Sequence, residues 1–243
     1  MTRSLTCSLE WMRHGTGLLL RALHDLGEGD LAAPTGLPGW SRGHLLAHVG
    51  FNAAALRRLV SWARTGEPSP MYASAEQRAA EIAEGASWSR DRLRALVRES
   101  AEGLAADLAD LAGPQWDALV VTAQGRTVPA SEIPWMRTRE VAVHTVDLDV
   151  GITFADLPDD LCEELVTDVV ARRAGRPGEP ALVLAGTTGR TWSLDGGGAE
   201  PAGDPAVEVT GTPAELARWL TGRGAGTLRD RSGGVLPALA AWL

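Results

Sequence analysis

Residues 139–148 read REVAVHTVDL, and they place a carboxylate and an imidazole four positions apart, at Glu140 and His144. In an α-helix, positions i and i+4 lie on one face about one turn apart, so these two side chains project the same way. The helix that carries them is predicted to open at Pro134 and to end before Gly151. The stretch therefore predicts a helix that presents two potential metal ligands on one face.

A third potential ligand, His48, lies in another predicted helix. Two imidazoles and a carboxylate form a mixed nitrogen and oxygen set that suits zinc. Three ligands leave one coordination position open for water or a substrate atom, which is typical of a catalytic metal and not of a structural one. The spacing alone is equally compatible with a buried polar pair and an unrelated histidine, because E-x-x-x-H is common on solvated helix faces.

The first 150 residues predict a helical bundle. Apolar residues recur with a helical period in four long stretches, at about 5–26, 41–64, 74–111 and 134–150. Ser41 is a good N-cap for the second stretch, and the third is expected to bend around Gly85. The apolar run 119–121 receives no assignment. Four long helices with polar ligands pointing inward describe a bundle that holds a metal between its members.

The pattern changes after about residue 153. A helix is predicted over about 158–173, and three short β-rich runs follow, at 181–184, 191–194 and 206–210. Thr212 and Glu215 form a capping box that predicts another helix, and a final helix is predicted over 236–243. The expected fold is therefore α plus α+β, with a four-helix bundle over residues 1–152 and a smaller domain over 153–243.

Composition excludes several functions. The net charge of −8 argues against nucleic acid as a partner, because phosphate binding requires a basic surface. No apolar run approaches the roughly 18–20 residues that a membrane helix needs. All 23 basic residues are arginine, which excludes a lysine Schiff base, a pyridoxal-phosphate anchor and a Walker lysine. Cys7 and Cys162 lie far apart and are interpreted as structural thiols of a cytoplasmic protein.

Three further residues have competing interpretations. Ser41 lies in a G-x-S-x-G motif, but a Pro- and Gly-rich loop precedes it where a nucleophile elbow needs a strand, so we favour the N-cap. His44 lies one turn before His48, but a fourth protein ligand would close the metal site, so a histidine of the surface or of the capping region is favoured. Asp147 is expected beside the ligands or on the surface, and not among them.

Longer blocks of the sequence match one family pattern. They are residues 37–48 (LPGWSRGHLLAH), residues 139–148 followed by Gly151, Tyr72 with Arg78, Glu81-Ile82, and residues 216–223 (LARWLTGR). In these blocks the chain resembles the mycothiol-dependent maleylpyruvate isomerase family. The resemblance covers nearly the whole chain, including the order of its two domains.

The resemblance implies a DinB-like N-terminal bundle, with zinc bound by His48, Glu140 and His144, and a smaller α/β C-terminal domain. It also implies mycothiol as the thiol cofactor and a role in activity for Arg223. In the implied reaction, the zinc-bound thiolate of mycothiol adds to the double bond of maleylpyruvate. Rotation and loss of the thiolate then yield fumarylpyruvate. Because this substrate is a dianion, Arg223 is expected to grip a carboxylate.

Two alternatives stay open. The family is broader than its name, so the same thiolate could conjugate another electrophile, as in a mycothiol S-transferase of detoxification or secondary metabolism. The other alternative is a zinc-stabilised helical module that binds a partner without catalysis, against which the open coordination position weighs. The expected partners are a small-molecule thiol and a small electrophile, expected to be a dicarboxylate. No feature of the sequence specifies an oligomeric state.

Overall fold

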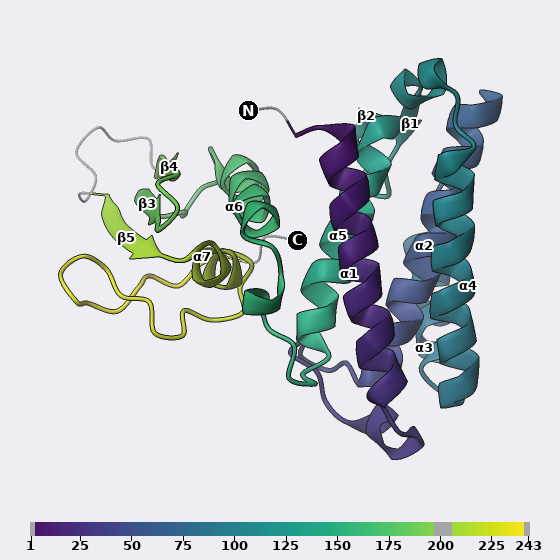
Figure 1. Cartoon of the computed structure of the whole chain (residues 1–243), viewed down its shortest axis with the longest axis horizontal. Helices are drawn as coiled ribbons and strands as arrows, with labels where there is room; N and C mark the ends of the chain where they lie inside the picture. Colours follow the sequence, from purple (N-terminus) through teal and green to yellow (C-terminus); the bar gives the residue numbers. More distant parts are fainter. Residues whose placement is uncertain (1–2, 197–205, 241–243) are drawn as a thin grey trace. The chain divides into compact units, whose positions relative to one another are not determined.

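The first 150 residues contain four long helices that run alongside one another (Figure 1). They are α1 (Leu5–Asp25), α2 (Arg42–Thr65), α4 (Arg90–Ala109) and α5 (Ile133–Asp147). The computed structural model describes residues 3–196 and 206–240. Contacts divide the chain into two units, one ending at Ile152 and the other beginning at Thr153. The predicted helical bundle is confirmed in the first unit.

Two clusters of buried apolar side chains hold the bundle together. One includes Leu56 of α2 and Leu104 of α4, and the other includes Leu46 and Val97 of the same two helices. Burying one such side chain stabilises the fold by about 1.5–3 kcal/mol. The bundle therefore has an apolar core that does not depend on a bound metal.

The prediction of a single bent helix over residues 74–111 is wrong, because the stretch forms two helices. The first, α3 (Ala75–Gly85), ends where Gly85 lies against α2, and a Cβ at Gly85 would come within 2.7 Å of the Cβ of Ala47. The second, α4, begins after Ser89, whose side chain caps it. Close packing and a new N-cap thus break the helix in two.

The unassigned run 119–121 forms strand β1 (Leu119–Val121), which pairs antiparallel with β2 (Thr127–Pro129). This hairpin leads into α5, which carries Pro134 in its first turn as predicted. Short 3-10 helices connect the larger elements at Glu28–Ala32, Gly113–Asp117, Ala130–Glu132 and Phe154–Asp156. Among the helices of residues 3–196 and 206–240, none is both long and apolar enough to cross a bilayer.

The second unit is a small α/β structure, as predicted. It contains α6 (Asp159–Arg173), β3 (Leu182–Gly186), β4 (Thr191–Leu194), β5 (Val207–Gly211) and α7 (Pro213–Leu220). The sheet has the order β4-β3-β5, in which β3 is antiparallel to β4 and parallel to β5. Thr212 caps α7, where its Oγ accepts a hydrogen bond from the backbone N–H of Glu215 at 3.2 Å.

The prediction of a final helix over residues 236–243 is wrong for residues 236–240, which are not helical, and residues 241–243 lie outside the described part of the chain. Such a short helix is marginal unless tertiary contacts support it. Here the contacts favour another conformation, because Leu236 is buried and Arg173 Nη2 donates to the backbone oxygen of Ala240 at 2.7 Å.

Candidate metal centre

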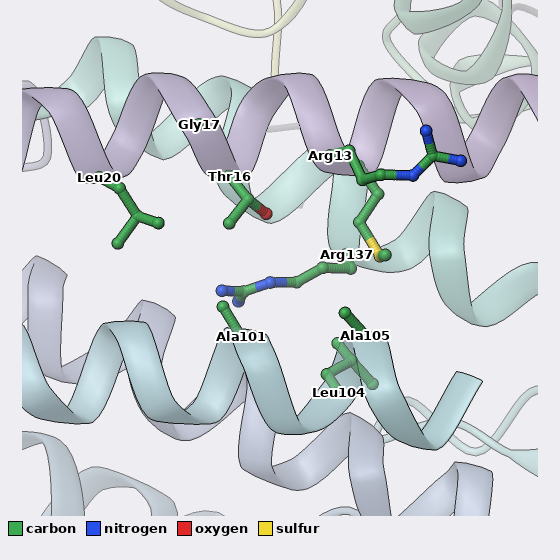
Figure 2. A pocket seen from close by; sticks show the side chains of 9 residues that line it. Arg13, Thr16, Gly17, Leu20, Ala101, Leu104, Ala105 and Arg137 are labelled. Carbon is green, nitrogen blue, oxygen red and sulfur yellow. The ribbon is translucent and has the colours of Figure 1, made fainter. Parts of the chain in front are cut away.

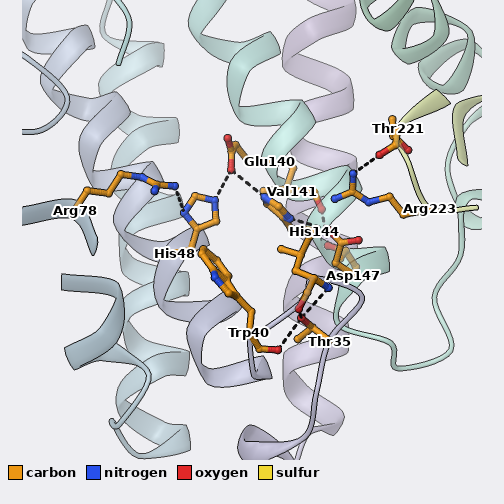
Figure 3. Close-up of polar contacts among 12 residues, drawn as sticks. Thr35, Trp40, His48, Arg78, Glu140, Val141, His144, Asp147, Thr221 and Arg223 are labelled. Carbon is orange, nitrogen blue, oxygen red and sulfur yellow. Dashed lines mark hydrogen bonds and ion pairs between the residues drawn. The ribbon is translucent and has the colours of Figure 1, made fainter. Parts of the chain in front are cut away.

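Three side chains converge between α2 and α5 (Figure 3). His48 projects from α2, and Glu140 and His144 project from α5. One potential ligand atom from each lies within 4.8 Å of the others. His48 Nε2 lies 2.9 Å from Glu140 Oε2, and His144 Nε2 lies 3.5 Å from the same oxygen. The fold thus brings together the three residues that the sequence singled out.

The start of α2 explains two of the competing interpretations. Ser41 is the N-cap of this helix, and its Oγ accepts from the backbone N–H of His44 at 3.4 Å. The ring of His44 folds back onto the cap, with Nδ1 2.8 Å from Ser41 Oγ, and His44 is outside the ligand cluster. The N-cap interpretation of Ser41 and the capping-region interpretation of His44 are therefore confirmed.

Asp147 orients one of the rings. Its Oδ2 lies 2.9 Å from His144 Nδ1, and its side chain is only 1% exposed. A hydrogen bond at Nδ1 fixes the plane of the ring and directs Nε2 toward Glu140. Carboxylates commonly hold metal-binding histidines in this way.

Two side chains, Arg78 and Trp40, contact His48 in ways that the sequence does not predict. Arg78 on α3 places Nη2 3.2 Å from His48 Nδ1, and the Trp40 ring packs edge-on against His48 with 5.4 Å between centroids. A guanidinium only donates hydrogen bonds, so Nδ1 is the acceptor and Nε2 carries the proton that faces Glu140. Arg78 was visible in the sequence only as part of the family pattern, because its contact depends on the break between α3 and α4.

The electrostatics of the cluster give each group a defined charge. Burial lowers the pKa of His48, so this ring is neutral near pH 7. Burial opposes ionisation of Glu140, but the hydrogen bonds of His48 and His144, and the positive charge that an imidazole carries when protonated, hold its pKa well below the usual value. Burial also opposes protonation of His144, but Asp147 and Glu140 outweigh it and raise its pKa to about 9. One imidazolium is therefore enclosed by two carboxylates.

Arg223 lies in the second unit, three residues after the end of α7. Its Nη1 donates to the backbone oxygen of Thr221 at 2.5 Å (Figure 3). Gly222 and Gly224 on either side have φ angles of 83° and 85°, a conformation that favours glycine. The loop thus holds the guanidinium in a turn, and the role of Arg223 in the reaction stays a prediction.

Two family models match the chain, one in each unit. Residues 12–149 match the mycothiol maleylpyruvate isomerase N-terminal domain, and residues 156–241 match the MDMPI C-terminal domain. The chain belongs to the mycothiol-dependent maleylpyruvate isomerase family. Among curated protein sequences, none matches this chain.

Two solved structures of this family share the fold. A mycothiol-dependent maleylpyruvate isomerase is 36% identical, with a TM-score of 0.89, over 97% of this chain and 98% of that one. A variant of such an enzyme, with one histidine replaced by alanine, is 35% identical, with a TM-score of 0.88 and the same coverage. The family is named for an enzyme activity. The alternative of a helical module that binds a partner without catalysis is therefore no longer supported.

The contact between Asp147 and His144 leads to a first prediction for this member of the maleylpyruvate isomerase family. Asp147→Asn should weaken the affinity of this cluster for added zinc by about 10- to 100-fold, because an amide holds the His144 ring less firmly and lowers its basicity. Competition with a chromogenic chelator measures the affinity. Asp149→Asn is the matched control, since Asp149 is exposed and lies just beyond the same helix. Equal zinc affinities in the two variants would contradict the role of Asp147.

Proposed function

We propose that this protein is a zinc- and mycothiol-dependent isomerase that converts maleylpyruvate into fumarylpyruvate through reversible addition of a thiolate. One observation carries the proposal: two imidazoles and a carboxylate converge at one point, with a further carboxylate behind one of the rings. The chain also belongs to a family whose solved members carry the name mycothiol-dependent maleylpyruvate isomerase.

The chemistry of the donor atoms fits zinc. His48 Nε2, a carboxylate oxygen of Glu140 and His144 Nε2 would hold the ion and leave a position for the sulfur of mycothiol. Zinc, when bound, supplies a Lewis acid that keeps a thiol ionised near neutral pH. A metal held by His48 Nε2 would require the ring proton to lie on Nδ1. Arg78, which lies 3.2 Å from Nδ1, would then have to release that nitrogen, because a guanidinium cannot accept a hydrogen bond.

The cysteines of the chain are poor alternatives to an added thiol. The side chain of Cys162 is fully buried, and burial, with the nearby carboxylates of α6, raises the pKa of its thiol to about 12. Cys7 lies in the first turn of α1 and is not a member of the ligand cluster. A thiolate is the species that attacks, so these observations support mycothiol as the nucleophile.

The substrate requires recognition of negative charge. Maleylpyruvate is a dianion, and arginine is the only permanent cation available in a chain without lysine. We assign the carboxylate contact to Arg223, whose guanidinium the Thr221 carbonyl already orients. A bidentate contact of this kind would position the double bond for attack and hold the carboxylate while the carbon–carbon bond rotates.

Zinc binding should release a proton. Near pH 7.5, His144 is protonated because its pKa is about 9, and it must lose that proton to offer Nε2 to a metal. His48 and Glu140 already have the protonation states that a metal needs. The apparent affinity should therefore rise about tenfold per pH unit below about pH 9 and then level off. Calorimetry in two buffers of different ionisation enthalpy counts the protons released, and a count of zero near pH 7.5 would contradict this assignment.

A turnover assay tests the proposed function. The zinc-loaded protein is incubated with mycothiol and maleylpyruvate, and separately with mycothiol and a generic electrophile. We expect fumarylpyruvate to form only when mycothiol is present. A stable thiol adduct with no isomer would instead identify a mycothiol S-transferase. No reaction with either electrophile would overturn both proposals.

A further inference from the structure

A buried arginine in the bundle has donors that the fold does not use. Arg137 of α5 is 1% exposed, and its Nη1 donates to the backbone oxygen of Val49 at 2.7 Å and to Asn52 Oδ1 at 3.1 Å. Its Nε and Nη2 have no hydrogen-bond partner among residues 3–196 and 206–240. Unpaired donors on a buried cation are costly, and they call for a partner such as an ordered water, an ion or a ligand.

The unused donors belong to one edge of the guanidinium. The Nε–H and Nη2–H bonds on this edge run parallel, and this pair is the one that grips both oxygens of a carboxylate. The opposite nitrogen, Nη1, is tied to α2 through Val49 and Asn52, which fixes the plane of the group. Arg137 is therefore oriented in advance for a planar anion.

This arginine borders a cavity of about 220 Å³ between α1 and α4. Figure 2 shows its side chain extending into the space between these helices, with Thr16 and Leu20 on one side and Ala101 and Leu104 on the other. Small residues on both helices leave this space unfilled. A cavity of about 150 Å³ lined by apolar side chains accommodates benzene, so this one has room for a slightly larger molecule.

The charge of the cavity favours an anion. No aspartate or glutamate is among the residues that line it, and Arg13, an exposed residue of α1, contributes a second cation. Burial lowers the pKa of Arg137 to about 10, so the guanidinium still carries its charge near pH 7. An apolar cavity with a fixed cation suits a ligand that combines one carboxylate with a compact apolar body.

We propose that this cavity is a second binding site, which takes a small apolar monocarboxylate on the free edge of Arg137. The carboxylate oxygens accept from Nε and Nη2, and the apolar body lies between α1 and α4. The site uses none of the three residues of the metal cluster, and the proposal does not depend on the proposed isomerase activity.

Benzoate is a suitable probe because it has a carboxylate on a ring of the right size. We expect it to shift the amide NMR signals of Thr16, Gly17 and Ala101 in the full-length, zinc-loaded protein. Benzyl alcohol, which is neutral and of similar shape, should bind at least about tenfold more weakly, because it cannot replace the bidentate charge pair. Binding should persist after a chelator removes the metal.

A matched pair of variants on α4 locates the site. Ala101→Leu fills the cavity while leaving Arg137 in place, and it should weaken benzoate binding at least about tenfold. Ala106→Leu is the control, because Ala106 is exposed and does not line the cavity, and it should bind benzoate like the wild type. Arg137→Met should also abolish binding. If that variant fails to fold because Nη1 no longer supports α2, the Ala101 and Ala106 pair still decides the question.

Several results would overturn the proposal. They are the absence of benzoate binding, equal binding of benzoate and benzyl alcohol, unchanged binding in Ala101→Leu, and loss of binding when the metal is removed. The last result would place benzoate on the metal instead of on Arg137.

Discussion

His144→Ala should lose the bound zinc and at least about 10³-fold of the thiol-dependent activity with every electrophile, since a metal that stabilises charge is worth several kcal/mol in the transition state. The variant lacks one of the three proposed protein ligands and leaves Glu140 with one imidazole in place of two. The loss should not depend on the charge of the electrophile, because the thiolate itself is no longer available. Metal analysis and initial rates with maleylpyruvate and an uncharged electrophile measure the two losses.

The fold should survive this change. The two apolar clusters of the bundle do not include His144, so the helical circular dichroism should match that of the wild type. His24→Ala is the control, because His24 is an exposed histidine at the end of α1 and should keep full zinc and activity. A His144→Ala protein that retains one zinc per chain and its activity would refute the proposed centre.

Arg223→Ala should lower kcat/KM for maleylpyruvate by about 30- to 1000-fold, corresponding to about 2–4 kcal/mol for the loss of a charge-pair partner. The same variant should change the rate with dimethyl maleate, which has no carboxylate, by less than about threefold. Zinc content should be unchanged, since Arg223 is not one of the ligands. Steady-state kinetics on both substrates therefore separates substrate recognition from thiol activation.

The control for this prediction is Arg229→Ala, an exposed arginine in the same unit. It should leave both rates near those of the wild type. An equal loss on the charged and uncharged substrates in Arg223→Ala would mean that Arg223 supports mycothiol binding or the fold of its loop. The carboxylate assignment would then fail.

The parts of the site that could be predicted from sequence are those determined by local spacing. Glu140 and His144 share a helix face wherever that helix lies, and the family pattern strengthened the choice of His48, on another helix, as their partner. The contact of Arg78 with His48 could not be predicted, because it depends on how α3 packs against α2 after the break at Gly85. Arg137 lies about one helical turn before Glu140 and so shares its helix face. That spacing is the feature of the sequence that could have indicated that Arg137 is buried.

The helices of the fold also divide into those that local sequence signals predict and those that depend on tertiary contacts. Elements with strong terminal signals, such as the helix capped by Thr212, lie where the sequence places them. The break between α3 and α4 requires knowing that Gly85 meets Ala47 across a helix interface, which no local pattern contains. The wrong prediction of a helix at residues 236–240 has the same cause. The Ala240 carbonyl accepts a hydrogen bond from Arg173, a residue far away in the sequence.

The hydrogen bonds of the ligand cluster also bear on how fast a metal can enter and leave. Arg78, His48, Glu140, His144 and Asp147 form an unbroken chain of contacts, so the donor atoms are held close together by the protein alone. In a zinc finger, by contrast, capture of the ion has to wait for the polypeptide to fold around it. Loading of this cluster with zinc, as proposed, would require only an exchange of protons and the departure of one guanidinium. A metal-free protein should therefore bind added zinc on mixing, without a slow refolding phase.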